Sequence, residues 1–151
     1  MPIQDYNTNF TQAGAISPTS TGTSEPGSVI DTLDAADWGM GNDWTWLINI
    51  ITAFSTGSSP TLQFQLQGNP TDSTFTSGNV TVYDTGTIAA ATLIAGYMFA
   101  FKYPRGYTVR WLRMVQIVGT AAFTTGSYLS WLSNDQVQDN KYFPAGYTIK
   151  S

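Results

Sequence analysis

Four aspartates, Asp31, Asp34, Asp37 and Asp43, are the carboxylates in this sequence that are grouped closely enough to suggest a chemical site. Several carboxylate oxygens together can bind Ca²⁺, although this spacing is not that of a helix–loop–helix calcium loop. Two carboxyl groups facing each other across a cleft could also hydrolyse a glycosidic bond. We favour a third interpretation, in which these aspartates bond to the backbone of their own turns.

Other catalytic chemistry is restricted by what the sequence lacks. It contains no histidine and no cysteine, which excludes Ser-His-Asp and Cys-His catalysis, imidazole and thiolate metal sites, and disulfides. No glycine-rich phosphate loop follows a predicted strand and opens a helix. We therefore expect a protein that is not an enzyme and that holds no cofactor.

The five tryptophans could bind sugars if enough of them formed an exposed platform. We expect Trp46, Trp111 and Trp131, which lie on predicted strands, to belong to the core. Trp38 lies in a glycine-flanked loop and is expected to be exposed, so a platform would use Trp38 and Trp44. This pattern supports a carbohydrate-binding β-sandwich as an alternative function.

Charge is scarce in this chain of 151 residues. Charged residues make up 11% of it and the formal net charge is −4, whereas an average soluble domain is roughly 25% charged. A neutral polar surface suits contact with another protein, because few hydrated charges must be stripped. An acidic chain does not suit nucleic acid. Arg110 and Arg113 either pair with carboxylates inside the fold or reach a partner chain.

No membrane segment is predicted. The first ten residues lack a basic region followed by an apolar core, so we expect no signal peptide. The most apolar run, residues 88–101, is shorter than the roughly 20 residues that span a bilayer, and Gly96 interrupts it.

Residues 107–126 predict the strand around which the fold is organised. Apolar side chains occur on both of its faces, which is typical of a central strand covered above and below. Residues 61–67, TLQFQLQ, alternate strictly and predict an antiparallel strand with one wet face. Further strands are predicted over residues 28–33, 44–54, 80–83, 88–94, 97–103, 126–132 and 146–150, with a loop over 34–43.

This pattern predicts an all-β fold, an antiparallel β-sandwich or jelly roll, with no convincing helix. The domain is expected over residues 28–151, preceded by an extended N-terminal arm over residues 1–27. The arm is either an unattached tail or a segment that orders on a neighbouring subunit. In the second case Tyr6 and Phe10 would be its anchors, with Ile16 beside them.

The order of several short motifs resembles one known family, the small jelly-roll capsid cement (decoration) proteins of short-tailed bacteriophages. The motifs are FTQA at 10–13, SVID at 28–31 followed by GMG at 39–41, the alternating strand at 61–67, and RWLR at 110–113 with the turn beyond it. Together they cover roughly residues 10–132 of the chain.

The resemblance implies a structural virion protein on the outer surface of an icosahedral shell. Its partners would be the major capsid protein, which has the HK97 fold, and further copies of itself as a homodimer or other homo-oligomer. We expect neither nucleic acid nor membrane as a partner. The candidate partner-contacting residues are Tyr6, Phe10, Ile16, Trp38, Arg105 and Arg110.

Overall fold

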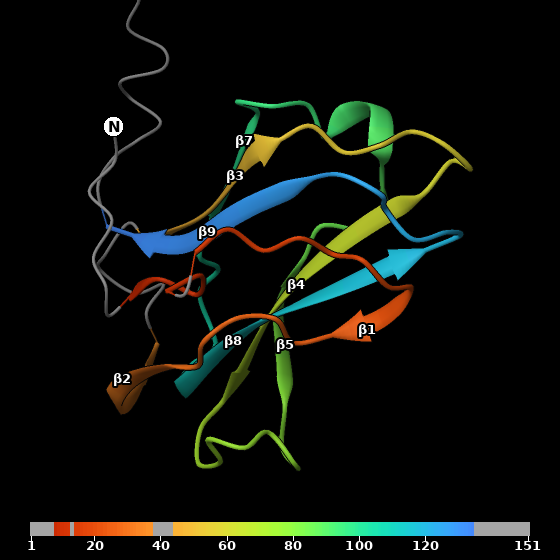
Figure 1. The fold of residues 1–151 in the computed structure, drawn as a ribbon. Helices are drawn as coiled ribbons and strands as arrows, with labels where there is room; N and C mark the ends of the chain where they lie inside the picture. The colour runs from red at the N-terminus through yellow and green to blue at the C-terminus, as the bar shows by residue number, and fades with distance from the viewer. Residues whose placement is uncertain (1–7, 13, 38–43, 135–151) are drawn as a thin grey trace, which may run out of the picture.

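The computed structural model describes residues 8–12, 14–37 and 44–134, which form two antiparallel sheets packed face to face (Figure 1). The all-β antiparallel sandwich predicted from the sequence is confirmed. The six-stranded sheet contains β1 (Gly22–Ser24), β2 (Ile30–Asp37), β4 (Thr61–Asn69), β5 (Val80–Asp84), β6 (Ile88–Ala89) and β8 (Thr108–Gly119). The three-stranded sheet has the order β7 (Met98–Lys102), β3 (Thr45–Thr52), β9 (Ser127–Ser133).

Strand β8 is the centre of the larger sheet, as its sequence predicts. It pairs with the whole length of β4 over residues 111–119 and, on its other side, with β1 and β2. Leu112, Met114 and Val118 are buried against the opposite sheet, and Val115 on the other face is also 1% exposed. The expected cover on both faces is thus only partial, because Trp111 and Ile117 on the outer face are half-buried.

Alternation along β4 sets which face of this sheet meets the core. Leu62, Phe64 and Leu66 are fully buried, whereas the intervening glutamines are half-buried on the outer face. The Phe64 ring meets the Tyr128 ring of β9 edge to face, with 4.8 Å between centroids, which joins the two sheets.

A polar contact also crosses the sandwich. The hydroxyl of Tyr128 donates to Oε1 of Gln116 at 2.6 Å, and Nε2 of Gln116 donates to the Ser24 hydroxyl at 2.9 Å. Tyr128 is fully buried, and this burial raises the pKa of its hydroxyl. The three residues link β9, β8 and β1 and leave no buried oxygen of Gln116 without a donor.

One glycine permits close packing at the start of β9. A Cβ at Gly126 would lie 2.4 Å from two carbons of the Phe54 ring, and the φ of Gly126 is +128°. Both the space and the backbone conformation therefore require glycine there.

Two predicted boundaries are wrong. The strand expected over residues 88–94 ends at Ala89, and a 3-10 turn over Ala90–Thr92 follows. After this turn the Leu93 side chain is fully buried in the core. The loop expected from Asp34 begins later, because β2 resumes its pairing with β8 through Asp37. The strand expected over 146–150 lies outside the described residues.

The N-terminal segment is built into the sandwich over its described residues, 8–12 and 14–27. Phe10 is 0% exposed, its amide donates to the carbonyl of Ser130, and Ile16 exchanges two backbone hydrogen bonds with Tyr128. Further along, β1 pairs with β8. The prediction that Phe10 anchors on a neighbouring subunit is wrong, because this side chain fills the core of its own chain. Tyr6 lies outside the described residues.

Candidate interaction site at strand β2

Strand β2 contains a wide bulge at the end of the larger sheet. Asp31 pairs with Trp111 and Ala36 pairs with Val109, so residues 32–35 lie opposite Arg110 alone. The Thr32 hydroxyl donates to the carbonyl of Arg110 at 2.7 Å and takes the place of a ladder bond. The bulge pushes the chain outward, away from its partner strand.

Leu33, within this bulge, has two unusual properties. Its φ is +72°, in the left-handed region, and its side chain is 75% exposed. The amide of Leu33 donates to Oδ1 of Asp31 at 2.8 Å, which holds this turn. A left-handed backbone at a non-glycine residue costs on the order of 1–3 kcal/mol, and such strain gathers at functional sites. No core packing repays that cost, because the side chain projects into solvent.

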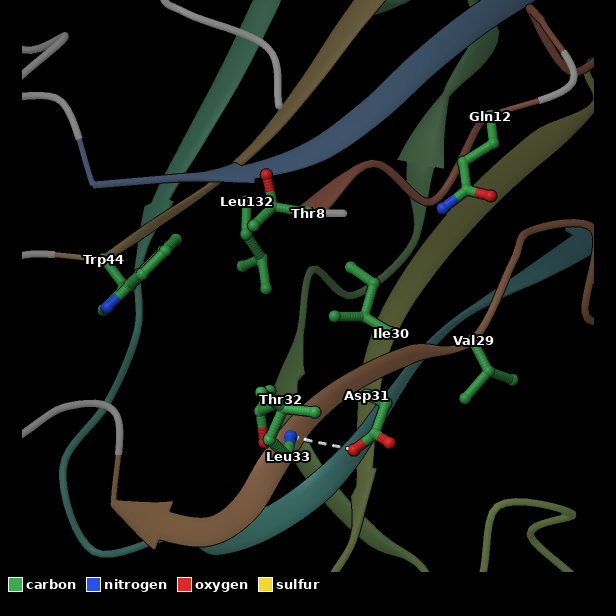
Figure 2. A pocket seen from close by; sticks show the side chains of 9 residues that line it. All are labelled: Thr8, Gln12, Val29, Ile30, Asp31, Thr32, Leu33, Trp44 and Leu132. Atoms are coloured by element: carbon green, nitrogen blue, oxygen red, sulfur yellow. Dashed lines mark hydrogen bonds between the residues drawn. The ribbon is translucent and has the colours of Figure 1, made fainter. Parts of the chain in front are cut away.

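A groove of about 440 Å³ lies beside the bulge (Figure 2). It is enclosed by the N-terminal segment, β2, the residue before β3 and the end of β9. Its apolar lining includes the exposed Val29 together with side chains of the core and its margin, and its polar lining comes from the N-terminal segment and β2. The lining residues are Thr8, Gln12, Val29, Ile30, Asp31, Thr32, Leu33, Trp44 and Leu132. This size is within the range of sites that accept side chains or small ligands.

Charges at the groove are arranged around Arg110. Its Nε and one terminal nitrogen donate to the two carboxylate oxygens of Asp31 at 2.8 and 3.0 Å, and its guanidinium lies 4.7 Å from the Trp111 ring. The hydrogen bond from Arg110 lowers the pKa of the Asp31 carboxyl, and the same bond raises the pKa of Arg110. Asp34 also raises the pKa of Arg110 through its negative charge, and it has no ion-pair partner within the described part of the chain.

Of the four aspartates, Asp31 bonds to the backbone of its own turn, as favoured above, whereas Asp37 bonds to the backbone of a distant turn. Asp31 accepts from the amide two residues on, and Asp37 Oδ2 accepts from the amide of Gly106 at 2.7 Å. This second bond attaches the turn that carries the exposed Arg105 to the end of β2. No group of three or more potential metal ligands occurs among residues 8–12, 14–37 and 44–134. Asp43 is not among the described residues.

The candidate partner-contacting residues chosen from the sequence lie at different places in the structure. Arg105 and Arg110 are both brought to β2, Ile16 lies half-buried on β9, and Trp38 lies outside the described residues. Sequence reasoning missed Val29 and Leu33. The sequence signal for Leu33 was a leucine within the polar stretch DTLDAAD, which we interpreted as an ordinary strand residue.

The tryptophans divide between the core and the margins. Trp46 and Trp131 are 1% and 4% exposed, as predicted, and the Trp46 indole donates to the Ser130 hydroxyl at 2.8 Å. Trp111 does not belong to the core, because it is half-buried on the outer face under Arg110. Trp44 is half-buried and contributes to the groove.

The outer face of the larger sheet differs from the groove because its side chains bond to one another. Asp84 accepts from two glutamines of β4, and Gln67 accepts from Arg113 through two nitrogens at 2.8 and 3.0 Å. Arg113 also pairs with Glu25 at 2.7 Å and lies over the Phe75 ring. We call this row the glutamine ladder; it comprises Glu25, Gln63, Gln65, Gln67, Asp84 and Arg113. Its polar groups have partners already, so a docking protein would gain few new bonds there.

Comparison with known sequences identifies the family to which the chain belongs. A sequence profile described as Bbp16 matches residues 10–132. The chain belongs to the Bbp16 family. The matched region begins at the buried Phe10 and ends at the buried Leu132, so the part shared by the Bbp16 family includes the N-terminal segment from Phe10 onward. No curated protein matches the chain closely enough to count as a relative.

No helix in the described residues is both long and apolar enough to cross a membrane.

Proposed function

We propose that this protein is a non-enzymatic capsid cement protein, which binds the outside of a tailed-phage head and joins neighbouring major capsid proteins. The observation that carries the proposal is the β2 groove, where the exposed side chains of Val29 and Leu33 border a cavity and Arg110 beside it is already paired with Asp31. Such a site offers contact area to a protein.

The surrounding fold supports the same proposal. A contact protein must keep its shape under load, and this sandwich is joined by the Tyr128–Gln116–Ser24 contact and by interlocked rings. A rigid binding surface loses little conformational entropy on docking. A cement protein that binds only the expanded shell would stabilise that shell by its own binding free energy, repeated over many copies.

The resemblance of the sequence to phage cement proteins supplies the class of partner. The partners are the HK97-fold major capsid protein and further copies of this chain, and the place of action is the outer surface of the virion. The net charge of −4 agrees with an external position, because packaged DNA would repel an acidic protein.

The test is co-sedimentation of the purified protein with expanded capsids of its own phage that lack it. We expect the protein to pellet with the shells and to reach a saturating stoichiometry. Folded protein that stays in the supernatant at all shell concentrations would refute the proposal. A truncated variant should remove residues 1–7 only, because removal of residues 1–27 would also take the buried Phe10 and strand β1.

A carbohydrate-binding function is the second candidate, and the presence of Trp44 in the groove favours it. An indole beside hydroxyl and carboxylate groups is a common way to hold a sugar ring. Titration of the protein with a panel of glycans, followed by tryptophan fluorescence, separates the two functions. A saturable change for one glycan, with no binding to shells, would favour the second candidate.

A further inference from the structure

The β2 groove combines three features that a monomer has no evident use for. Leu33 is 75% exposed on a left-handed backbone, and Val29 is 41% exposed on the same side of the groove. The groove itself leads from these two side chains to the margin of the core at Leu132 and Trp44. Figure 2 shows the labelled side chains arranged around this space. Exposed aliphatic side chains bordering a cavity are typical of a protein contact.

The aspartates beside the β2 groove indicate which kind of protein segment could bind there. Three aspartates lie on β2, and one arginine, Arg110, pairs with the first of them. Asp37 is used by the backbone of Gly106, while Asp34 has no ion-pair partner among residues 8–12, 14–37 and 44–134. A partner that buried this acidic margin would need a cation opposite it, because an unpaired charge is costly to desolvate.

We propose that the β2 groove is the surface that contacts the capsid shell, and that it receives a segment of the major capsid protein with a large apolar side chain and a neighbouring lysine or arginine. The apolar side chain enters the groove between Val29 and Leu33, and the basic group lies against Asp34. This inference rests on the proposed function and adds the contact surface and its chemistry.

The apolar half of the inference is tested by Leu33→Asn. Asparagine tolerates the left-handed backbone better than leucine, so this variant replaces the apolar side chain by a polar one and keeps the turn. Val80→Asn is the matched control, because Val80 is an exposed aliphatic residue, 38% accessible, on β5 at the other edge of the sheet. We expect Leu33→Asn to weaken co-sedimentation with shells about ten-fold, as for a contact that carries much of the binding. Val80→Asn should bind like the wild type.

The charged half is tested by Asp34→Asn and Asp34→Glu. We expect Asp34→Asn to weaken shell binding several-fold at low salt and by less at high salt, because screening reduces such an attraction. Asp34→Glu keeps the charge and should restore most of the affinity. Equal affinity of Asp34→Asn and the wild type at low salt would remove the basic residue from the proposal.

The occupant is identified by placing a photo-cross-linking amino acid at Val29, with Val80 again as control. Cross-links from position 29 to the major capsid protein support the inference. Cross-links to a second copy of this chain would overturn it and assign the groove to an oligomer. Shell binding by Leu33→Asn equal to that of the wild type would also overturn it, while the cement function would stand. Failure of the wild type itself to pellet would instead refute the proposed function.

Discussion

Replacement of Phe10 by alanine tests whether the N-terminal segment is part of the folded domain. The Phe10 side chain is 0% exposed and belongs to the core cluster that fills the sandwich. Removing a buried phenylalanine costs about 3–5 kcal/mol, since transfer free energy is lost and a cavity remains. A domain of this size is stable by only about 5–15 kcal/mol, so the loss is a large fraction of the total. We therefore expect Phe10→Ala to fold but to unfold much more readily.

Urea and thermal unfolding, followed by circular dichroism, give the measurement. The expected loss corresponds to a fall in Tm of roughly 6–20 °C, at about 2–4 °C for each kcal/mol in a protein of this length. Ile94→Ala is the control, because Ile94 is 56% exposed and its loss should change stability by less than about 0.5 kcal/mol. Equal midpoints for Phe10→Ala and Ile94→Ala would refute the reasoning. They would mean that the segment acts only on a neighbouring chain.

Three further predictions concern close packing, a buried hydrogen bond and acid stability. Gly126→Ala should destabilise the protein by more than about 2 kcal/mol in urea unfolding, because its Cβ would overlap a buried ring, whereas Gly57→Ala, with open space around it, should be nearly neutral. Tyr128→Phe should cost about 1–3 kcal/mol in the same assay by leaving Oε1 of Gln116 without its donor, and a loss no larger than that of the Gly57 control would contradict this. Asp72 accepts bonds from two threonine side chains and their amides, which lower its pKa far below the usual value of 3.8. The unfolded chain then binds more protons, so stability is complete above about pH 4 and falls as the pH drops below it. The slope of Tm against pH below 4 should be shallower for Asp72→Asn, and an unchanged slope would argue against these bonds.

Strand periodicity made most of the sandwich predictable. The alternation in TLQFQLQ is strict, and residues 107–118 form a long run with apolar residues on both faces, so β4 and the central β8 follow directly. The end of the strand at Ala89 was not predictable in the same way. Residues 88–94 are apolar except for Thr92 and carry no period that separates a strand from a tight turn. Long-range packing of Leu93 decides that boundary.

The role of the N-terminal segment was misjudged for a related reason. A segment rich in small polar residues with a few aromatic residues suits both a free arm and a strap across its own domain. Phe10 has the same sequence signature in either case. What distinguishes them is whether the edge of β9 is available, and the backbone bonds from Phe10 and Ile16 to that edge settle the choice. Such information is tertiary and has no local trace in the sequence.

The candidate site was not predicted from the sequence, because Leu33 is not a residue type expected at a position with positive φ. A bulge position with positive φ normally holds glycine or asparagine, so the DTLDAAD stretch gave no sign that its leucine is turned outward. Arg110 was recognised as either an internal pair or a partner contact, and it forms an internal pair with Asp31 at the rim of the groove. The charged residues in the sequence thus indicated the region around Arg110, whereas the apolar side chains of the groove, Val29 and Leu33, were not predicted.

The contrast between the two ends of β8 shows why binding should concentrate at the groove. Toward Gln116, the long polar side chains on and beside the strand have partners within the chain, through the glutamine ladder on one face and Tyr128 on the other. A docking protein there would displace water without gaining bonds. Toward Arg110 the bulge interrupts the ladder, and aliphatic surface with an acidic margin is left in water. Burial of that surface gains free energy roughly in proportion to its area, and the strain at Leu33 is then offset by contact that the isolated chain lacks.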